Sequence, residues 1–244
     1  MGYYRQGPPP GGYGVRVGVP PVTPMVKRLI AINVAIWIVQ FVAYQAFDNF
    51  ALQRWFGLNL QIGVLKGMIW QPFTYFWLHD PNGIWHILFN MLMLWMFGGD
   101  LERNWGGRAF LRYYLVCGIG AGLFIMLGNA INGDPVPTLG ASGAIYGLLL
   151  AYGVVFAERT VLFMMMFPMK ARTLAIVFFV ISFFSLFQRG QGSVSHIAHL
   201  GGAIVGFIFL KRLWNVRRWV SELRWKLKRR QFKVVDRDED RWIN

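Results

Sequence analysis

The chain has 244 residues, of which 55% are hydrophobic and only 15% are charged, and its formal net charge is +14. This composition argues against a soluble globular protein, because the apolar residues come in blocks that approach the roughly 20 helical residues needed to cross a bilayer. The single cysteine, Cys117, excludes an intrachain disulfide. The basic charge first suggests nucleic acid or anionic lipid as a partner.

Six apolar blocks follow one another along the chain. They lie at about 28–47, 83–99, 109–129, 141–157, 171–187 and 195–213. Because helices satisfy their own backbone hydrogen bonds in lipid, we predict an all-α, polytopic membrane helix bundle with six transmembrane helices. Three parts are expected: a disordered cytoplasmic Gly/Pro-rich tail over 1–27, the membrane domain over 28–213, and a basic cytoplasmic tail over 214–244.

The distribution of Lys and Arg predicts the orientation. Of the 25 basic residues, only Arg54, Lys66 and Arg189 fall in the loops after the first and fifth blocks. The remaining 22 lie near the opposite ends or in the tails, so the positive-inside rule puts both termini in the cytoplasm. The excess of basic residues is therefore explained by the orientation of the chain in the membrane, and no nucleic-acid partner is expected. The basic part of 214–244 would either lie on anionic headgroups or form a solvated helix.

Two shorter apolar stretches do not read as spans. Segment 48–82 is rich in aromatic and aliphatic residues but interrupted, so we expect a first loop partly embedded in the outer leaflet. The run from Val161 to Met166 stops before Pro168 and is too short to cross, so we place it at the inner interface.

Four polar residues are expected to meet at one depth. The second, fourth and sixth blocks all run from outside to inside, and their first turns carry His86 with Asn90, Ser142, and His199. Taken singly, each has an ordinary role in packing or helix association. Their coincidence at one depth favours a functional site, because polar side chains in a membrane are costly without partners.

Glycines on two of these blocks would let the helices approach closely. Gly143 and Gly147 form one G-x-x-x-G pattern, and Gly202 and Gly206 form another. Close packing would bring the Ser142 hydroxyl within hydrogen-bond reach of His199. Tight packing or dimerisation alone would explain the glycines but not the serine and histidine beside them.

A serine–histidine dyad is what the sequence permits. Every carboxylate is placed elsewhere: Asp48, Asp80 and Asp134 in outer loops, and Asp100, Glu102, Glu158 and the others on the cytoplasmic side. Tyr146 lies one turn below Ser142, where its ring could stack on the imidazole of His199 and restrict it. The start of the helix at Ser142 offers free backbone N–H groups, which with Asn90 and His86 would form an oxyanion hole.

These residues resemble the rhomboid family of intramembrane serine proteases, of the six-helix bacterial type. The matching pieces, in order, are His86-x-x-x-Asn90, Gly98-Gly99-x-x-Glu102, Gly140-x-Ser142-Gly143 with Tyr146, and Ala198-His199-Leu200-Gly201-Gly202. They cover roughly residues 28–212. Where the family often has Trp-Arg in the first loop, this chain has Trp70-Gln71, which leaves the anchoring of that loop open.

The resemblance implies an activity and roles for the residues. Ser142 would be the nucleophile and His199 the general base, while His86, Asn90, Gly140 and Tyr146 would bind the oxyanion or substrate. The four patterned glycines and Glu102 would serve packing, and His196 would be a bystander. The implied substrates are single-span membrane proteins cut near the outer leaflet of a bacterial cytoplasmic membrane, with no cofactor or metal.

Three other functions compete with this interpretation. The histidines at 79, 86, 196 and 199 all fall on the outer side and could ligate a metal or haem, although no H-E-x-x-H pattern accompanies them. A catalytically dead relative that binds transmembrane clients would be expected to lose the serine or the histidine. A transporter or channel lacks support, because nothing charged is buried at mid-membrane.

Overall fold

The structure is a computed structural model that describes residues 21–47, 50–133, 136–163, 167–187 and 193–211. Its helices are α1 (Pro24–Phe47), α2 (Ala51–Phe56), α3 (Gln71–Thr74), α4 (Ile84–Trp105), α5 (Gly107–Asn132), α6 (Ser142–Val155), α7 (Ala171–Ser185) and α8 (Ser193–Leu210). Two single-turn 3₁₀ helices, η1 (Val64–Lys66) and η2 (Tyr75–Trp77), lie in the first loop. The predicted tail over 214–244 and most of the tail over 1–27 lie outside the described residues.

The helical membrane bundle is present, but only three helices have the length of a full span. Within the described residues these are Pro24–Ala46, Ile84–Trp105 and Gly107–Ile131. Three further apolar helices are shorter: Ser142–Val155, Ala171–Ser185 and His196–Leu210. At 1.5 Å per residue, a helix of 14 residues is about 21 Å long, less than the roughly 30 Å of a hydrocarbon core. The count of six spans therefore stays a prediction.

The prediction of an all-α chain is wrong at one place. Strand β1 (Thr160–Phe163) pairs antiparallel with β2 (Phe167–Lys170), with Thr160 opposite Lys170. The short apolar run expected at the inner interface thus contributes β1 of a hairpin. Its β-branched Thr160 and Val161 favour a strand, and Pro168 cannot continue a helix.

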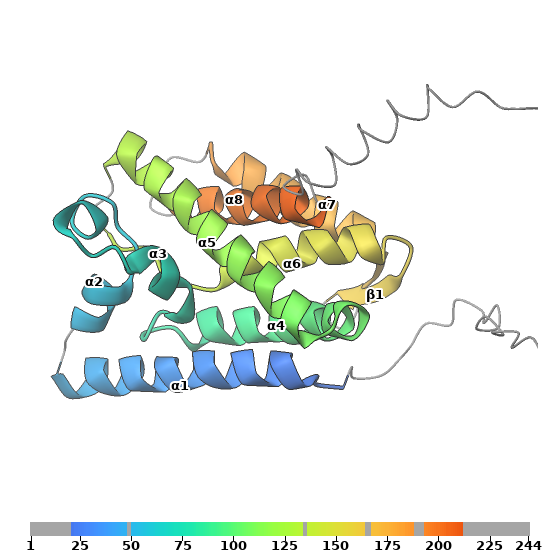
Figure 1. The fold of residues 1–244 in the computed structure, drawn as a ribbon, viewed down its shortest axis with the longest axis horizontal. Helices are drawn as coiled ribbons and strands as arrows, with labels where there is room; N and C mark the ends of the chain where they lie inside the picture. Colours follow the sequence, from blue (N-terminus) through green and yellow to red (C-terminus); the bar gives the residue numbers. More distant parts are fainter. Residues whose placement is uncertain (1–20, 48–49, 134–135, 164–166, 188–192, 212–244) are drawn as a thin grey trace, which may run out of the picture. The chain divides into compact units, whose positions relative to one another are not determined.

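Helix α6 lies inside the bundle formed by the other long helices. In Figure 1, α1 and α4 run side by side, α5 crosses over α4 and α6, and α7 and α8 lie on the side away from α1. Helix α6 is apolar all round and buries nine of its 14 residues, from Gly143 to Gly153. An apolar circumference suits a central position, because every face of the helix meets another element.

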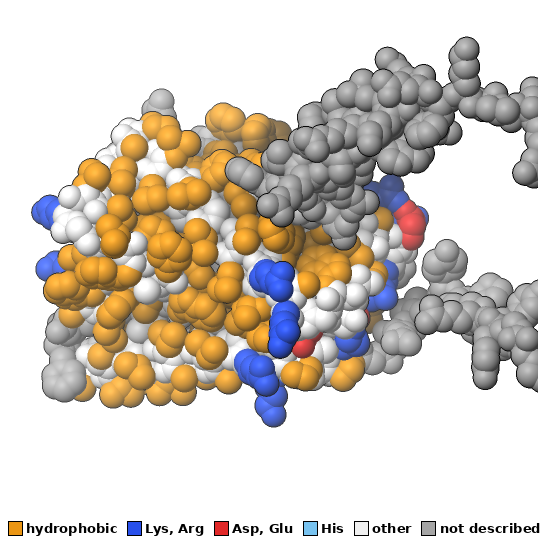
Figure 2. Space-filling view, in the orientation of Figure 1, with side chains coloured by type: hydrophobic (Ala, Val, Ile, Leu, Met, Phe, Trp, Pro, Cys, Tyr) orange, Lys and Arg blue, Asp and Glu red, His pale blue; other side chains and the backbone are white. Residues whose placement is uncertain are grey.

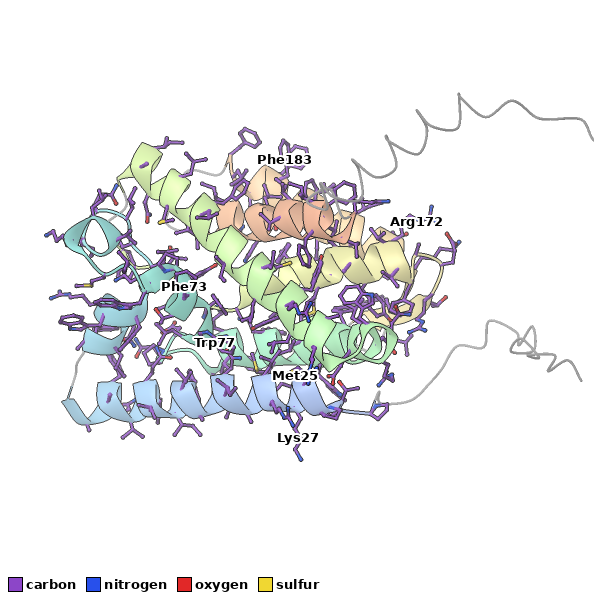
Figure 3. All side chains as sticks on the ribbon, in the orientation of Figure 1. Met25, Lys27, Phe73, Trp77, Arg172 and Phe183 are labelled. Carbon is purple, nitrogen blue, oxygen red and sulfur yellow. The ribbon has the colours of Figure 1, made fainter. Side chains whose placement is uncertain are left out.

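Glu102 caps the first helix. Its carboxylate, on α4, accepts hydrogen bonds from the hydroxyl of Thr23 and from the backbone N–H groups of Met25 and Val26, the latter two at 2.9 Å. These N–H groups belong to the first turn of α1, which has no intrahelical acceptor for them. Figure 3 shows Met25 at this end of α1 and Lys27 pointing away from the bundle. The residue expected to serve packing therefore fixes α1 to α4.

Gln71 anchors the first loop, where the family pattern often has arginine. Its side chain is fully buried, accepts from the backbone N–H of Asn59 at 3.1 Å and donates to the carbonyl of Arg54 at 3.1 Å. Beside it, the rings of Trp55 and Trp70 stack at 6.3 Å. An amide can donate and accept at once, so Gln71 bonds the two loop segments at Arg54 and Asn59 without bringing a charge into the loop.

The surface separates by polarity. In Figure 2, a broad hydrophobic surface lies between the few basic side chains near the first loop and those gathered around the start of α1 and the hairpin. Lys27 at the start of α1 and Arg172 beside the hairpin, both labelled in Figure 3, belong to these regions. Phe183 points outward from α7 (Figure 3), with 43% of its surface exposed. This pattern suits a protein whose apolar belt faces lipid.

Candidate active site

Ser142 is the first residue of α6, and the backbone before it is held in an unusual conformation. Gly140 has φ 120°, which side-chain-bearing residues rarely adopt, and its N–H donates to the carbonyl of Tyr75 in the first loop at 3.1 Å. The residue before the helix, Ala141, makes no side-chain cap. The first N–H groups of α6 are therefore not capped by its side chain and lie at the positive end of the helix dipole.

His199 on α8 faces this serine. Its Nε2 lies 2.9 Å from the Oγ of Ser142. The ring of Tyr146 stacks on the imidazole, with centroids 4.1 Å apart and planes 4° from parallel. The other ring nitrogen, Nδ1, is buried and has no hydrogen-bond partner among the described residues. The arrangement is thus a pair, in which an aromatic ring restricts the imidazole by stacking on its face rather than by bonding Nδ1 as the carboxylate of a triad does.

The two helices come this close because glycines line their contact. A Cβ on Gly202 of α8 would overlap the carbonyl oxygen of Gly143 on α6, and one on Gly206 would lie 3.2 Å from the Cα of Gly147. On the third side, Cys117 of α5 fills the space against Gly147. Backbone packs directly on backbone here, so a side chain of any size would push α6 and α8 apart.

His86 on α4 lies against the residue two positions before the serine. A Cβ on Gly140 would lie 2.8 Å from the Nε2 of His86, so the imidazole rests on this glycine, two residues before Ser142. The backbone N–H of Asp80 donates to Nδ1 of His86 at 3.3 Å. Because Nδ1 accepts, the neutral ring carries its proton on Nε2, where it can donate toward the site.

Asn90 is placed beside His86 but not against the dyad. Its side chain is buried, and Nδ2 donates to the backbone carbonyl of His86 at 2.7 Å within α4. His86 and Asn90 are four residues apart in the sequence, which puts both on one face of α4, as expected. Among the hydrogen bonds of the described residues, none joins Asn90 to Ser142 or His199.

The remaining histidines lie next to these two rings. The ring of His196 meets that of His199 edge-on at 5.8 Å, and the ring of His79 lies 5.2 Å from that of His86. Across the described part of the chain, no group of three or more His, Cys, Asp or Glu side chains is arranged to hold a metal ion.

Sequence patterns did not reveal the backbone groups that hold the site. The carbonyl of Tyr75 and the N–H of Asp80 both belong to the first loop, and each bonds a residue of the site from there. Such contacts depend on how the loop folds over α4 and α6. The aromatic residues of the loop were its only signal, and they pointed to the membrane interface instead.

Comparison with known proteins identifies the family. A family model described as the Rhomboid domain matches residues 66–215. RHOMBOID-like protein 1 of Arabidopsis thaliana is 30% identical over 172 residues, 68% of this chain and 41% of the relative. Rhomboid protease GluP of Bacillus subtilis is 33% identical over 153 residues, 62% of this chain and 27% of the relative.

A shorter relative is covered more fully. The putative rhomboid protease YdcA of Bacillus subtilis is 28% identical over 190 residues, 76% of this chain and 86% of the relative. The first relatives are longer, and this chain spans less than two thirds of their length. The matched segment covers more than half of the chain and includes every residue of the candidate site, so the chain belongs to the rhomboid family and is an integral, multi-pass membrane protein.

Proposed function

We propose that this protein is an intramembrane serine endopeptidase that cleaves membrane-protein substrates with a Ser142–His199 dyad. The observation that carries the proposal is the 2.9 Å separation between His199 Nε2 and Ser142 Oγ. A hydroxyl becomes a competent nucleophile when a base within hydrogen-bond reach can take its proton. The names of related proteins, which include rhomboid proteases of two bacteria, support the same reaction class.

The reaction begins with proton transfer. His199 removes the proton from Ser142 at Nε2 as Oγ attacks the scissile carbonyl carbon, which gives a tetrahedral oxyanion and an imidazolium. The imidazolium then gives its proton to the leaving amine, and the C–N bond breaks to leave an acyl-enzyme. A water molecule, deprotonated by the same nitrogen, hydrolyses the ester and restores the serine. Stacking on Tyr146 holds the imidazole in place through both halves.

The oxyanion would be stabilised from two helices. The backbone N–H groups at the start of α6 supply donors and the positive end of a dipole. The Nε2–H of His86 supplies another donor from α4. Asn90 uses one side-chain N–H on the carbonyl of His86, and its second N–H is available to a substrate oxygen. Gly140 has no side chain, which leaves room for the imidazole of His86 beside the start of α6.

The expected setting follows from the charge distribution and the place of the site. Six spans with both termini in the cytoplasm put the start of α6 near the outer leaflet, so single-span substrates would be cut there. We place the protein in a bacterial cytoplasmic membrane, with the basic tail over 214–244 against anionic headgroups. The division into a tail over 1–27, a protease over 28–213 and a tail over 214–244 stays part of the proposal, except that residues 24–27 belong to α1 and not to the tail.

The test is cleavage of a single-span reporter protein in liposomes by the wild type, Ser142→Ala and His199→Ala. We expect cleavage by the wild type and a loss of at least about 1000-fold in each variant. The variants should keep the wild-type melting temperature, which separates chemistry from folding. Cleavage by Ser142→Ala at the wild-type rate would exclude the serine mechanism.

A further inference from the structure

The side chain of Gln40, in the middle of α1, is bonded twice to the first loop. Its Nε2 donates to the carbonyl of His79 and its Oε1 accepts from the backbone N–H of the same residue, both at 3.0 Å. Gln40 is only 1% exposed and His79 is fully buried. The amide therefore pairs with both backbone groups of one residue, which belong to two successive peptide groups, and it fixes the direction of the backbone there.

A second bond from α1 holds the next residue. The indole Nε1–H of Trp37 donates to the carbonyl of Asp80 at 2.9 Å. Three hydrogen bonds from one face of α1 thus hold the backbone of residues 79 and 80. The carbonyl of His79 and the N–H of Asp80 belong to one planar peptide group, so the bond from Gln40 to this carbonyl leaves the N–H little freedom to rotate.

The N–H that is fixed in this way is the one that bonds His86. Asp80 donates from its backbone nitrogen to Nδ1 of His86 at 3.3 Å, and the opposite nitrogen of that ring, Nε2, faces Gly140. The hydrogen bond at one nitrogen decides which nitrogen carries the proton. The hydrogen bonds from α1 to the loop therefore influence the Nε2–H of His86, which is the donor that faces the site.

The neighbouring histidine does not disturb this arrangement. The ring of His79 lies 5.2 Å from that of His86. Burial lowers the pKa of His79 to about 3, with a smaller contribution from His86, so the ring is neutral at physiological pH. No positive charge on His79 therefore acts on His86.

We propose that Gln40 is a positioning residue for His86: it holds the His79–Asp80 peptide so that the N–H of Asp80 keeps the proton of His86 on Nε2. Trp37 holds the next peptide group through the carbonyl of Asp80. The inference rests on the proposed function, in which His86 donates to the oxyanion. Both residues lie on α1, outside the segment 66–215 that matches the family model.

A merely structural role would tie α1 to the loop and change stability alone. Asn33 provides the matched control, because it is also a fully buried amide on α1, but it donates to the carbonyl of Leu29 within its own helix. Asn33→Leu and Gln40→Leu both replace a buried amide of α1 by an aliphatic side chain. Only the second breaks the bonds to residue 79.

The experiment uses the full chain in detergent and two readouts. Cleavage of the single-span reporter gives kcat and KM, and ¹⁵N NMR of histidine-labelled protein reports which ring nitrogen of His86 is protonated. The His86 signal is assigned by its loss in His86→Ala. For Gln40→Leu we expect kcat to fall on the order of 10-fold or more with KM within about twofold, since a donor is misplaced rather than a binding surface lost. The NMR signal should change from the Nε2–H form to a mixture of both forms.

Conservative variants sharpen the test. Gln40→Glu keeps an acceptor for the N–H of His79 but loses the donor to its carbonyl, which belongs to the peptide group that carries the N–H of Asp80, so kcat should fall as in Gln40→Leu. Trp37→Phe removes a single hydrogen bond, so it remains informative if Gln40→Leu does not fold, and it should shift the same NMR signal. Asn33→Leu should leave kcat and the His86 signal as in the wild type.

Two results would overturn the inference: an unchanged His86 signal in a folded Gln40 or Trp37 variant, or an equal loss of kcat in Asn33→Leu. The NMR readout does not depend on proteolysis. If Ser142→Ala cleaved as well as the wild type, the proposed function would fail while the tautomer measurement still decided the role of Gln40.

Discussion

The Oγ of Ser142 and the Nε2 of His199 lie 2.9 Å apart, although 57 positions separate them in the chain. The first sits at the beginning of α6 and the second lies in the second turn of α8. Their contact depends on the direct packing of Gly143 against Gly202 between the same two helices. Chemistry and helix packing are therefore coupled at this point.

Replacing Gly202 by alanine should disable the site by separating the helices. The added Cβ would overlap the carbonyl oxygen of Gly143. We expect a loss of about 100-fold in kcat, because a displacement of about 1 Å is enough for this, and a loss of about 1–3 kcal/mol in unfolding free energy. Reporter cleavage and thermal unfolding measure the two effects.

Gly99→Ala is the control for that substitution. A Cβ there would meet its nearest atoms at 3.6 Å, an ordinary contact, and α4 should gain up to about 1 kcal/mol from the better helix former. Equal kcat values for the two variants would show that the close approach of α6 and α8 does not control the dyad.

Gly140→Ala should impair catalysis through His86. The new Cβ would lie 2.8 Å from Nε2 and 2.9 Å from Cε1 of that imidazole. We expect kcat to fall about 10- to 100-fold as the donor is displaced. Gly106→Ala also places alanine outside the left-handed helical region, at φ 81° and ψ 152°, but has nothing within 4 Å, so its kcat should match the wild type. A similar loss in both variants would point to backbone strain as the cause.

Tyr146 should act through its ring. Tyr146→Phe keeps the stack on His199 and should retain kcat within about threefold, whereas Tyr146→Leu removes it and should lower kcat about 10- to 100-fold. Steady-state cleavage at saturating reporter measures this difference. If phenylalanine proved as damaging as leucine, the hydroxyl rather than the ring would be the part that matters.

Glu102→Ala should lower stability and spare the chemistry. It leaves the first-turn N–H groups of Met25 and Val26 without their acceptor, which costs about 2–3 kcal/mol. The folded protein should keep kcat within about twofold, because Glu102 is near the far end of α4 from His86.

The matched control is Glu158→Ala, another carboxylate on that side of the bundle. Its ion pairs with Lys170 and Arg172 are half exposed, so its loss should change stability by no more than about 0.5 kcal/mol. Thermal unfolding in one detergent compares the two variants. Equal melting temperatures would contradict the capping role of Glu102.

Local patterns in the sequence were enough to predict the helical segments and the candidates for the site. Apolar blocks of helical length are a local property, and each predicted block overlaps one of the helices α1, α4, α5, α6, α7 and α8. The motifs around Ser142 and His199 are local too, and the small residues beside them pointed to a close helix contact. Local composition was less informative where a short apolar run could be strand or interfacial segment, as at Val161.

The groups that hold the site together depend on how distant segments pack in the folded chain. Glu102 became the cap of α1, Gln71 the anchor of the first loop, and the N–H of Asp80 the partner of His86. None of these bonds is encoded by spacing along one helix, because a buried donor takes whichever acceptor the folded chain brings within about 3 Å of it. Local hydropathy predicts where the helices lie, whereas the packing of one helix or loop on another determines which groups form hydrogen bonds.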